Sequence, residues 1–221
     1  MDMVTLCSLK KYFDEGPRQV QAVDGIDLSI EKGKFTAVTG ASGSGKTTLL
    51  NLIGGLCRPT EGTVTVGGVD LGTLREEELT IFRRRKVGFV FQDCRLVPEL
   101  TVRENILLPL ALDRSRPDTA FFEEVTGLLG LSKTLDDFPH TLSGGGQQCA
   151  AIARALITRP AVLLADEPTG RFDARTAQNV AGLLSMTADA FHQTLILITH
   201  NPELAQLADR VVRLRNGRIV K

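Results

Sequence analysis

A glycine-rich run that ends in a lysine and a threonine is the first group of residues whose types and spacing suggest chemistry: residues 40–47 read GASGSGKT. Glycines allow backbone N–H groups to converge on phosphate oxygens at the start of a helix, and a lysine adds a positive charge for the β- and γ-phosphates. A threonine hydroxyl in this place ligates Mg²⁺. We therefore predict a nucleotide-phosphate site made by Gly40, Ser42, Gly43, Ser44, Gly45, Lys46, Thr47 and Thr48.

Two adjacent carboxylates, Asp166 and Glu167, follow an apolar run at residues 161–165. Alone, such a pair is usually a solvated turn at the end of a strand. Beside a phosphate-binding loop it suits two roles: Asp166 would share Mg²⁺ with Thr47, and Glu167 would polarise a water for attack on the γ-phosphate. The combination predicts hydrolysis of a nucleoside triphosphate.

The elements that must position these residues follow from the periodicity of the apolar residues. Short apolar, β-branched runs indicate buried strands of a mostly parallel sheet, and the glycine-rich run lies between one of them and a helix. We expect these strands at residues 35–39, 87–91, 161–165 and 194–199, and the helix at 47–56. Alternating apolar and polar residues predict antiparallel strands at residues 4–9, 22–30, 63–66 and 69–71.

A stretch with helical spacing lies between the strands of the predicted parallel sheet. The fold class is therefore α/β, a P-loop NTPase with a mostly parallel core sheet, an N-terminal antiparallel β lobe and an inserted α-helical lobe. The chain shows no internal repeat. We expect a single domain over residues 1–221, in which residues 1–92 with 160–221 form the core and the β lobe, and about 93–159 form the helical lobe.

The balance of charges argues against a nucleic-acid partner. Lys plus Arg and Asp plus Glu each number 26, so the formal net charge is zero and no global positive field attracts a polyanion. The basic run Arg83–Lys86 is interpreted as a solvated helix face. The apolar runs fall short of the roughly 20 residues of a membrane span. No signal-peptide pattern is visible, and the four scattered cysteines are expected to be reduced thiols, which favours the cytoplasm.

Four further motifs follow in order along the chain. They are Gln92 after an apolar strand, LSGGGQQ at residues 142–148, Asp173 after the two carboxylates, and His200 after another apolar strand. With the glycine-rich run and the carboxylates, this set resembles the ATP-binding subunits of ABC transporters over nearly the whole chain. Strings such as TTLLNLIGGL at residues 47–56 are similar to the subgroup of macrolide exporters, lipoprotein-release systems and bacitracin-type peptide resistance systems.

In that family two subunits sit head to tail, and each ATP lies between the phosphate loop of one subunit and the LSGG motif of the other. The resemblance implies that Ser143, Gly144 and Gly145 bind the ATP of a second copy of this chain. A helix start with free N–H groups is an anion site, which agrees with that role. Asp173 would lie across the dimer interface.

The resemblance also implies ATP and Mg²⁺ as cofactors. Gln92 would reach the Mg²⁺ ion alongside Thr47 and Asp166. His200 would contact the γ-phosphate. The implied catalytic set is thus Glu167, His200, Gln92 and Lys46.

The adenine base requires a stacking partner. Tyr12 is the only tyrosine and the chain has no tryptophan, so the resemblance implies that Tyr12 stacks on the base. Phe13 is an alternative, and a role in the core is a third.

The family resemblance implies that a separate membrane permease is the partner. The chain would then be cytoplasmic and peripheral on the inner face of the cell membrane, and Asp93–Leu112 would form part of the groove for the permease. Members that act on DNA or ribosomes are excluded because the segment between Gln92 and Ser143 is too short for their insertions, and because the chain holds one ATPase cassette.

Three residues depart from the family pattern. Gly146 stands where Gln or Glu is usual, Cys149 where Arg is usual, and Arg171 where the subgroup commonly has Asn. A glycine in the first turn weakens a helix, and the loss of Arg removes a charge and several donors. These changes put efficient dimer closure in question. The alternative function is therefore an ATP-binding regulatory or mechanotransmitting module with weak turnover.

Overall fold

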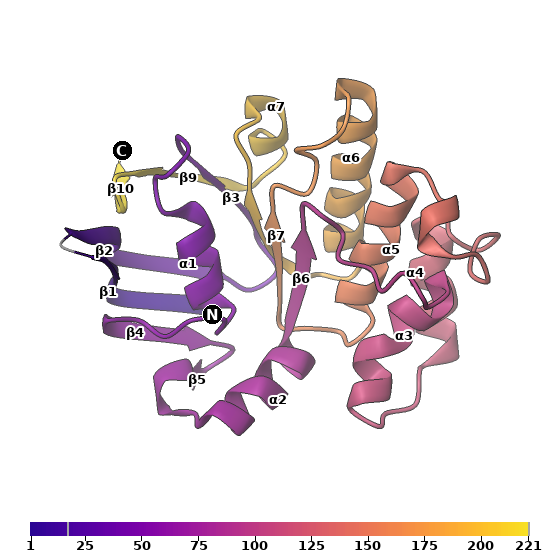
Figure 1. The fold of residues 1–221 in the computed structure, drawn as a ribbon, viewed down its shortest axis with the longest axis horizontal. Coiled ribbons are helices and arrows are strands. Elements are labelled where there is room, and N and C mark those ends of the chain that lie inside the picture. The colour runs from indigo at the N-terminus through magenta and orange to yellow at the C-terminus, as the bar shows by residue number, and fades with distance from the viewer. Residues whose placement is uncertain (17, 221) are drawn as a thin grey trace.

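Two sheets and the helices around them make up the structure, a computed structural model that describes residues 1–16 and 18–220 (Figure 1). The first sheet is antiparallel and has the order β2-β1-β4-β5. Its strands are β1 (Asp2–Glu15), β2 (Arg18–Glu31), β4 (Glu61–Val66) and β5 (Val69–Asp70). The second sheet has the order β10-β9-β3-β8-β7-β6, and its strands are β3 (Phe35–Thr39), β6 (Val87–Phe91), β7 (Val162–Asp166), β8 (Thr194–Ile198), β9 (Arg210–Arg215) and β10 (Arg218–Val220).

The helices lie near the antiparallel sheet, above the parallel strands and at the opposite end of the molecule. Helices α3, α4 and α5 lie at the end away from the antiparallel sheet, and α6 and α7 lie above the parallel strands in the view of Figure 1. The helices are α1 (Lys46–Ile53), α2 (Glu76–Lys86), α3 (Val102–Leu112), α4 (Thr119–Leu128), α5 (Gly144–Leu156), α6 (Ala174–Ala190) and α7 (Pro202–Ala205), with 3₁₀ turns at Leu71–Thr73 and Pro139–Thr141. Among the described residues, none of the helices combines the length and apolar character that a membrane span needs.

The parallel strands bring the segments that follow them to one edge of the sheet. Phe91 pairs with Asp166, and Asp166 pairs with Ile198. Val38 also pairs with Ile198. Strands β3, β6, β7 and β8 therefore end side by side, and ligands of such sheets bind outside their carboxyl ends.

Helix α1 is buried between the two sheets. Leu49, Leu50, Leu52 and Ile53 are at most 2% exposed, and they belong to one cluster with core residues of β1, β4, β7 and β8. A helix that is apolar on several faces needs such double burial. The start of α1, and the loop before it, is fixed by this packing.

A second buried cluster joins the helices at the other end to the parallel sheet. It includes Ile106 of α3, Val125 of α4, Ile152 of α5 and Leu184 of α6, together with Leu163 of β7. Helices α3, α4 and α5 therefore do not have a core of their own. They pack directly on the sheet and α6.

The predicted fold class is confirmed, with differences at the ends of elements. The expected helix at residues 47–56 ends at Ile53, because Gly54 caps it and Gly55 adopts a φ of 66°. A glycine in the left-handed region after the last turn is a common helix stop. Strands β1 and β2 extend well beyond residues 4–9 and 22–30 because their hairpin pairing continues through polar residues, where hydrophobic alternation is invisible.

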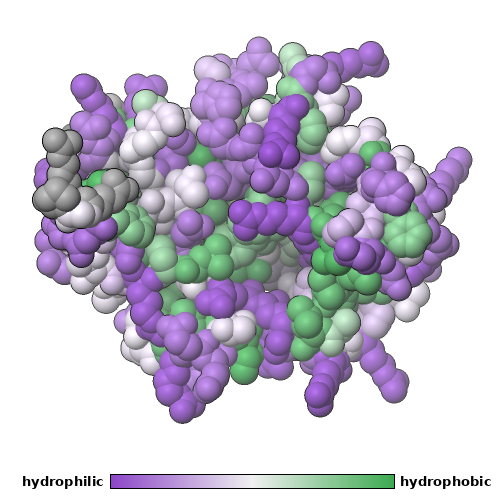
Figure 2. All heavy atoms as spheres, viewed as in Figure 1, coloured by the Kyte–Doolittle hydropathy of each residue, from purple (hydrophilic) through white to green (hydrophobic). Residues whose placement is uncertain are grey.

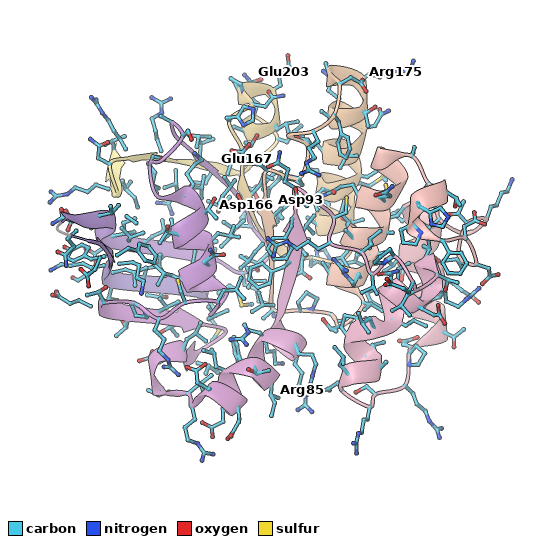
Figure 3. All side chains as sticks on the ribbon, in the orientation of Figure 1. Arg85, Asp93, Asp166, Glu167, Arg175 and Glu203 are labelled. Carbon is cyan, nitrogen blue, oxygen red and sulfur yellow. The ribbon has the colours of Figure 1, made fainter. Side chains whose placement is uncertain are left out.

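Two residues of the basic run at residues 83–86 form ion pairs, while the side chain of Arg85 stays 57% exposed, as expected for a solvated face, and that of Arg84 is 27% exposed. Arg84 and Arg85 form ion pairs of 2.7 and 2.9 Å with Asp113, whose side chain is 12% exposed. Hydrogen bonds from Arg85 and Arg84 hold the pKa of Asp113 below its usual value. The labelled Arg85 in Figure 3 lies at the end of α2. The run thus joins α2 to the end of α3.

Gly88 on β6 offers a test of the packing between β6 and α5. A Cβ added there would lie 2.5 Å from the backbone oxygen of Ala155. We expect Gly88→Ala to lower the free energy of unfolding by about 1–3 kcal/mol, the usual cost of overpacking. Urea denaturation measures it.

Gly182 in α6 is the matched control, because nothing lies within 4 Å of an added Cβ there. Gly182→Ala should raise the stability by roughly 0.5–1 kcal/mol through helix propensity. Equal effects of the two substitutions would show that β6 and α5 are not in close contact.

Candidate functional site

The glycine-rich loop between β3 and α1 is shaped by backbone contacts that only glycine permits. Gly40 and Gly45 have φ values of 154° and 99°, and a Cβ would collide with the carbonyl oxygens of Leu214 and Ala22 respectively. Strands β9 and β2 therefore hold the loop from two sides. Lys46 is 7% exposed, and its Nζ donates to the carbonyl oxygens of Gly40 and Ala41, each at 2.9 Å.

A hollow of about 580 Å³ lies over this loop; we refer to it as the loop hollow. Most of the predicted phosphate-site residues line it, and so do two residues from the ends of β7 and β8. The lining residues are Phe13, Val20, Gln21, Ala22, Gly40, Ser42, Gly43, Gly45, Lys46, Thr47, Thr48, Glu167 and His200. Ser44 does not line it; its buried hydroxyl is without a hydrogen-bond partner among the described residues.

Glu167 and His200 contact each other at the rim of the loop hollow. His200 Nδ1 lies 2.6 Å from Glu167 Oε2, and because the carboxylate accepts, the imidazole donates from Nδ1. Glu167 has a φ of 44°, an unusual conformation for a residue with a side chain. Backbone strain of this kind clusters at functional sites. Figure 3 shows Glu167 beside Asp166 above the end of β7.

Asp166 and Thr47 provide the oxygen atoms for a cation. The Thr47 hydroxyl lies 3.4 Å from Asp166 Oδ1, and burial raises the pKa of Asp166. No group of three or more His, Cys, Asp or Glu side chains that could hold a metal occurs in residues 1–16 and 18–220. One hydroxyl and one carboxylate fit Mg²⁺, which takes a few protein oxygens and fills the remaining positions with phosphate and water.

Gln92 does not line the loop hollow, and neither do the residues that are predicted to act at the ATP site of a second copy. Gln92 follows β6 and contacts the segment after Glu167: its Nε2 lies 3.0 Å from the place of a Cβ on Gly170. Ser143 caps α5 by accepting a hydrogen bond from the N–H of Gly146. Asp173 caps α6, and the N–H of Thr176 holds the pKa of Asp173 below its usual value.

Tyr12 does not line the loop hollow, whereas Phe13 does and is 39% exposed. The Tyr12 hydroxyl donates to Asp24 Oδ1 at 2.7 Å. Asp24 also accepts two hydrogen bonds from Arg218 of β10. Asp24 and Arg218 belong to no motif, so sequence reasoning missed them.

A larger hollow of about 950 Å³ lies against the same loop and shares Gly40, Ser42, Gly43 and His200 with the loop hollow. Its remaining wall comes mainly from α7 and β9, with further residues of the loop, of the turn after β9 and of β10. It contains none of Lys46, Thr47 and Glu167. The chemistry predicted for the site therefore belongs to the smaller loop hollow.

The fold and the loop hollow together define a P-loop nucleotide-binding protein. Residues 23–170 match the family described as ABC transporter. The chain belongs to this family, and its predicted membership is confirmed.

The relatives of the chain include proteins with names from the predicted subgroup. "Lipoprotein-releasing system ATP-binding protein LolD" of Bordetella avium is 44% identical over 96% of this chain and 93% of its own length. "Uncharacterized ABC transporter ATP-binding protein YvcR" of Bacillus subtilis is 43% identical over 99% and 86%. "Macrolide export ATP-binding/permease protein MacB" of Rhodopirellula baltica is 42% identical, and the chain spans 33% of it.

The ATP-binding cassette MJ0796, solved as a dimer in a post-hydrolysis state bound to ADP and Pi, superposes with a TM-score of 0.87. It is 36% identical, and the match covers 99% of this chain and 97% of that one. The P-loop fold is thus confirmed, and binding of ATP is a property of the family to which this chain belongs.

The two adjacent aromatic residues give a prediction about base stacking. Because Phe13 lines the loop hollow and Tyr12 is tied to Asp24, we expect Phe13→Ala to weaken ATP binding about tenfold, within the scale of base–aromatic stacking. Binding of inorganic tripolyphosphate should stay unchanged. Titration calorimetry measures both ligands.

Tyr12→Phe is the control, since it keeps the ring and removes only the hydrogen bond to Asp24. It should bind ATP within about twofold of the wild type. A large loss of ATP affinity in Tyr12→Ala with none in Phe13→Ala would assign the stacking to Tyr12 instead.

Proposed function

We propose that the chain binds and hydrolyses ATP as one half of a head-to-tail dimer and thereby drives a separate membrane permease. One observation carries the hydrolytic part: the fold brings Lys46, Thr47, Glu167 and His200 to one hollow at the carboxyl ends of parallel strands. The Glu167–His200 contact of 2.6 Å then joins a carboxylate to an imidazole beside the phosphate loop.

The candidate site residues in and beside the loop hollow have separate proposed tasks. Backbone N–H groups of the loop and the ammonium of Lys46 bind the phosphates. Thr47 and Asp166 would hold Mg²⁺, with Gln92 as a further contact, and the ion would supply neutralisation of the charge on the phosphate oxygens. Glu167 accepts a proton from the attacking water, and His200 orients Glu167 and contacts the γ-phosphate.

The separation of the two halves of the site supports the dimer. Ser143, Gly144 and Gly145 lie at the start of α5, outside the loop hollow. A helix N-terminus attracts an anion, and a second copy would present its ATP there. The dimeric state of the related cassette bound to ADP and Pi supports a dimer. In the proposed arrangement Asp173 lies at the interface.

A groove between α2, β6 and α3 supports the permease as partner. Its volume is about 450 Å³, and it includes Phe89, Phe91, Leu108 and Leu112. Leu112 is 62% exposed, and Figure 2 shows hydrophobic side chains on both sides of a hollow near the centre of this face. We propose that the permease docks here, which would place the chain on the cytoplasmic face of the membrane.

We also propose that the chain is a single ATPase domain over residues 1–221. Residues 1–92 with 160–221 form its core and β lobe, and about 93–159 form its helical lobe.

Two of the three departures from the family pattern leave the helix start intact. Helix α5 begins at Gly144 although Gly146 lies in its first turn, because Ser143 caps it. Cys149 is 7% exposed and points into the core, where burial raises the pKa of its thiol to about 11. These observations favour turnover over the weak regulatory alternative.

Glu167→Gln tests the hydrolysis. The substitution removes the proton acceptor, so we expect turnover to fall roughly 10²-fold or more while ATP affinity stays within a few-fold. Phosphate release should rise more than linearly with wild-type concentration if the dimer is the active form, and sedimentation should detect a trapped dimer of the variant with ATP.

Glu124→Gln on α4 is the control, since Glu124 is an exposed carboxylate away from the loop hollow. It should hydrolyse ATP like the wild type. If the wild type shows neither a single-turnover burst nor steady-state release, the binding-only alternative holds and the proposed hydrolysis fails.

Leu112→Asp tests the permease groove. A charge in the apolar rim should prevent docking, so we expect the variant to leave the membrane fraction of its native host while the wild type sediments with it. Immunoblotting of membrane and soluble fractions measures the distribution. ATP hydrolysis by the purified variant should be unchanged.

Met186→Asp on α6 is the control because Met186 is also exposed, at 44%, but does not line the groove. It should stay with the membranes. Membrane association of Leu112→Asp equal to that of the wild type would rule out this groove as the docking site.

A further inference from the structure

Arg171, the third residue that departs from the family pattern, pairs with an acidic residue of another loop. Its Nη2 lies 2.8 Å from Asp93 Oδ1. Asp93 directly follows Gln92, and Arg171 lies between Glu167 and Asp173. Figure 3 shows Asp93 beside Asp166 and Glu167 at the ends of β6 and β7. The ion pair therefore joins the loop after β7 to the loop after β6 within one chain.

A second contact joins the same two loops. Gln92 Nε2 lies 3.0 Å from the place of a Cβ on Gly170, so the backbone of the β7 loop packs against the Gln92 side chain. The N–H of Gly170 also donates to the carbonyl oxygen of Glu167 at 3.0 Å. A displacement of the Gln92 loop would thus reach Glu167 through a continuous path of contacts.

On its other side the Gln92 loop is held by α5, the helix that begins with Ser143. Gln148 Nε2 donates to the carbonyl oxygen of Phe91 at 3.1 Å, and Gln148 Oε1 accepts from Cys94 Sγ at 2.7 Å. Arg154 donates to the carbonyl oxygens of Cys94 and Arg95, each at 2.6 Å. The loop at residues 92–95 therefore lies between the α5 helix and the loop that carries the candidate base.

From these contacts we infer that the Arg171–Asp93 pair positions Glu167 by tying its loop to the Gln92 loop, so that movement of α5 or of Gln92 changes the rate of hydrolysis in the same subunit. This inference rests on the proposed ATP hydrolysis. Arg171 and Asp93 are positioning residues that act through Glu167.

The pair suits control of position better than stability. The side chains of Arg171 and Asp93 are 61% and 54% exposed, and exposed ion pairs contribute little to folding. A small displacement of a reacting group, however, lowers the rate of a chemical step strongly. Loss of the pair should therefore reduce turnover while the fold remains.

The test is a double-mutant cycle on ATP hydrolysis with Arg171→Asn, Asp93→Asn and both together. Each single variant should lower kcat about three- to tenfold with KM within about twofold, and the double variant should match the singles, because contacting residues couple. The exchanged pair, Arg171→Asp with Asp93→Arg, should recover at least half of the wild-type kcat. Thermal denaturation should show the same Tm for all variants.

The exposed pair Arg159–Asp118, at 3.0 Å and with side chains 62% and 57% exposed, provides the control cycle. Its variants should leave kcat unchanged. If Arg171→Asn lowers kcat while Asp93→Asn does not, and the exchange fails to restore it, Arg171 acts on something other than Asp93 and the inference is overturned.

Hydrogen exchange of the segment at residues 92–97 separates this inference from the proposed function. Both single variants should exchange faster there, and the exchanged pair should be protected like the wild type. Unchanged exchange in the single variants would overturn the positioning role whatever the turnover. If the wild type does not hydrolyse ATP, the proposed function fails, while the exchange experiment still decides whether the two loops are tied together.

Discussion

Burial of α1 between the two sheets is the constraint on which the site depends. Leu49, Leu50, Leu52 and Ile53 contribute to a core shared by both sheets, so the start of the helix cannot move without disturbing that core. The loop before the helix is held as well, because the backbone oxygens of β9 and β2 contact Gly40 and Gly45. Lys46 and the N–H groups of the loop are thus preorganised for an anion, and the chain needs no net positive charge to bind one. Since the formal charge is zero, specificity for phosphate arises locally, from aligned backbone dipoles and one ammonium.

The parallel sheet then determines which groups meet this loop. Because β7 and β8 flank each other and end in register, Glu167 and His200 come together although they are far apart in the sequence. The left-handed conformation of Glu167 follows from the turn at the end of β7, where its N–H donates to the carbonyl oxygen of Ile198. Strain at this residue is tolerated because the buried strands on both sides determine its position.

Much of the fold could be predicted because its strongest signals are local. The strands at residues 35–39 and 87–91 occur with the predicted bounds, since short β-branched runs between turns have few alternatives. The length of β1 and β2 was missed, because pairing across a hairpin, rather than apolar alternation, extends them. The candidate site divides in the same way. Motifs predicted most of the phosphate-loop residues of the loop hollow, with Glu167 and His200, but not Val20, Gln21 and Ala22, which also line it. Nothing in the sequence relates Tyr12 to Asp24 and Arg218, or Arg84 and Arg85 to Asp113, because such contacts depend on the folded arrangement.

The arrangement also explains why a departure from a family pattern need not weaken the protein. Cys149 stands where the family usually has Arg, but its side chain lies in the core on α5, and Gln148 and Arg154 of the same helix still hold the loop after β6. Arg171 adds a charge at the point where the loops after β6 and β7 touch, and Asp93 neutralises it. Arg171 thus joins the Gln92 loop to the Glu167 loop, and Cys149 lies on α5, the helix that holds the Gln92 loop. Neither change touches the phosphate loop. If hydrolysis in this chain differs from that of its relatives, the physical cause should lie in the transmission between these three elements rather than in the binding of the nucleotide.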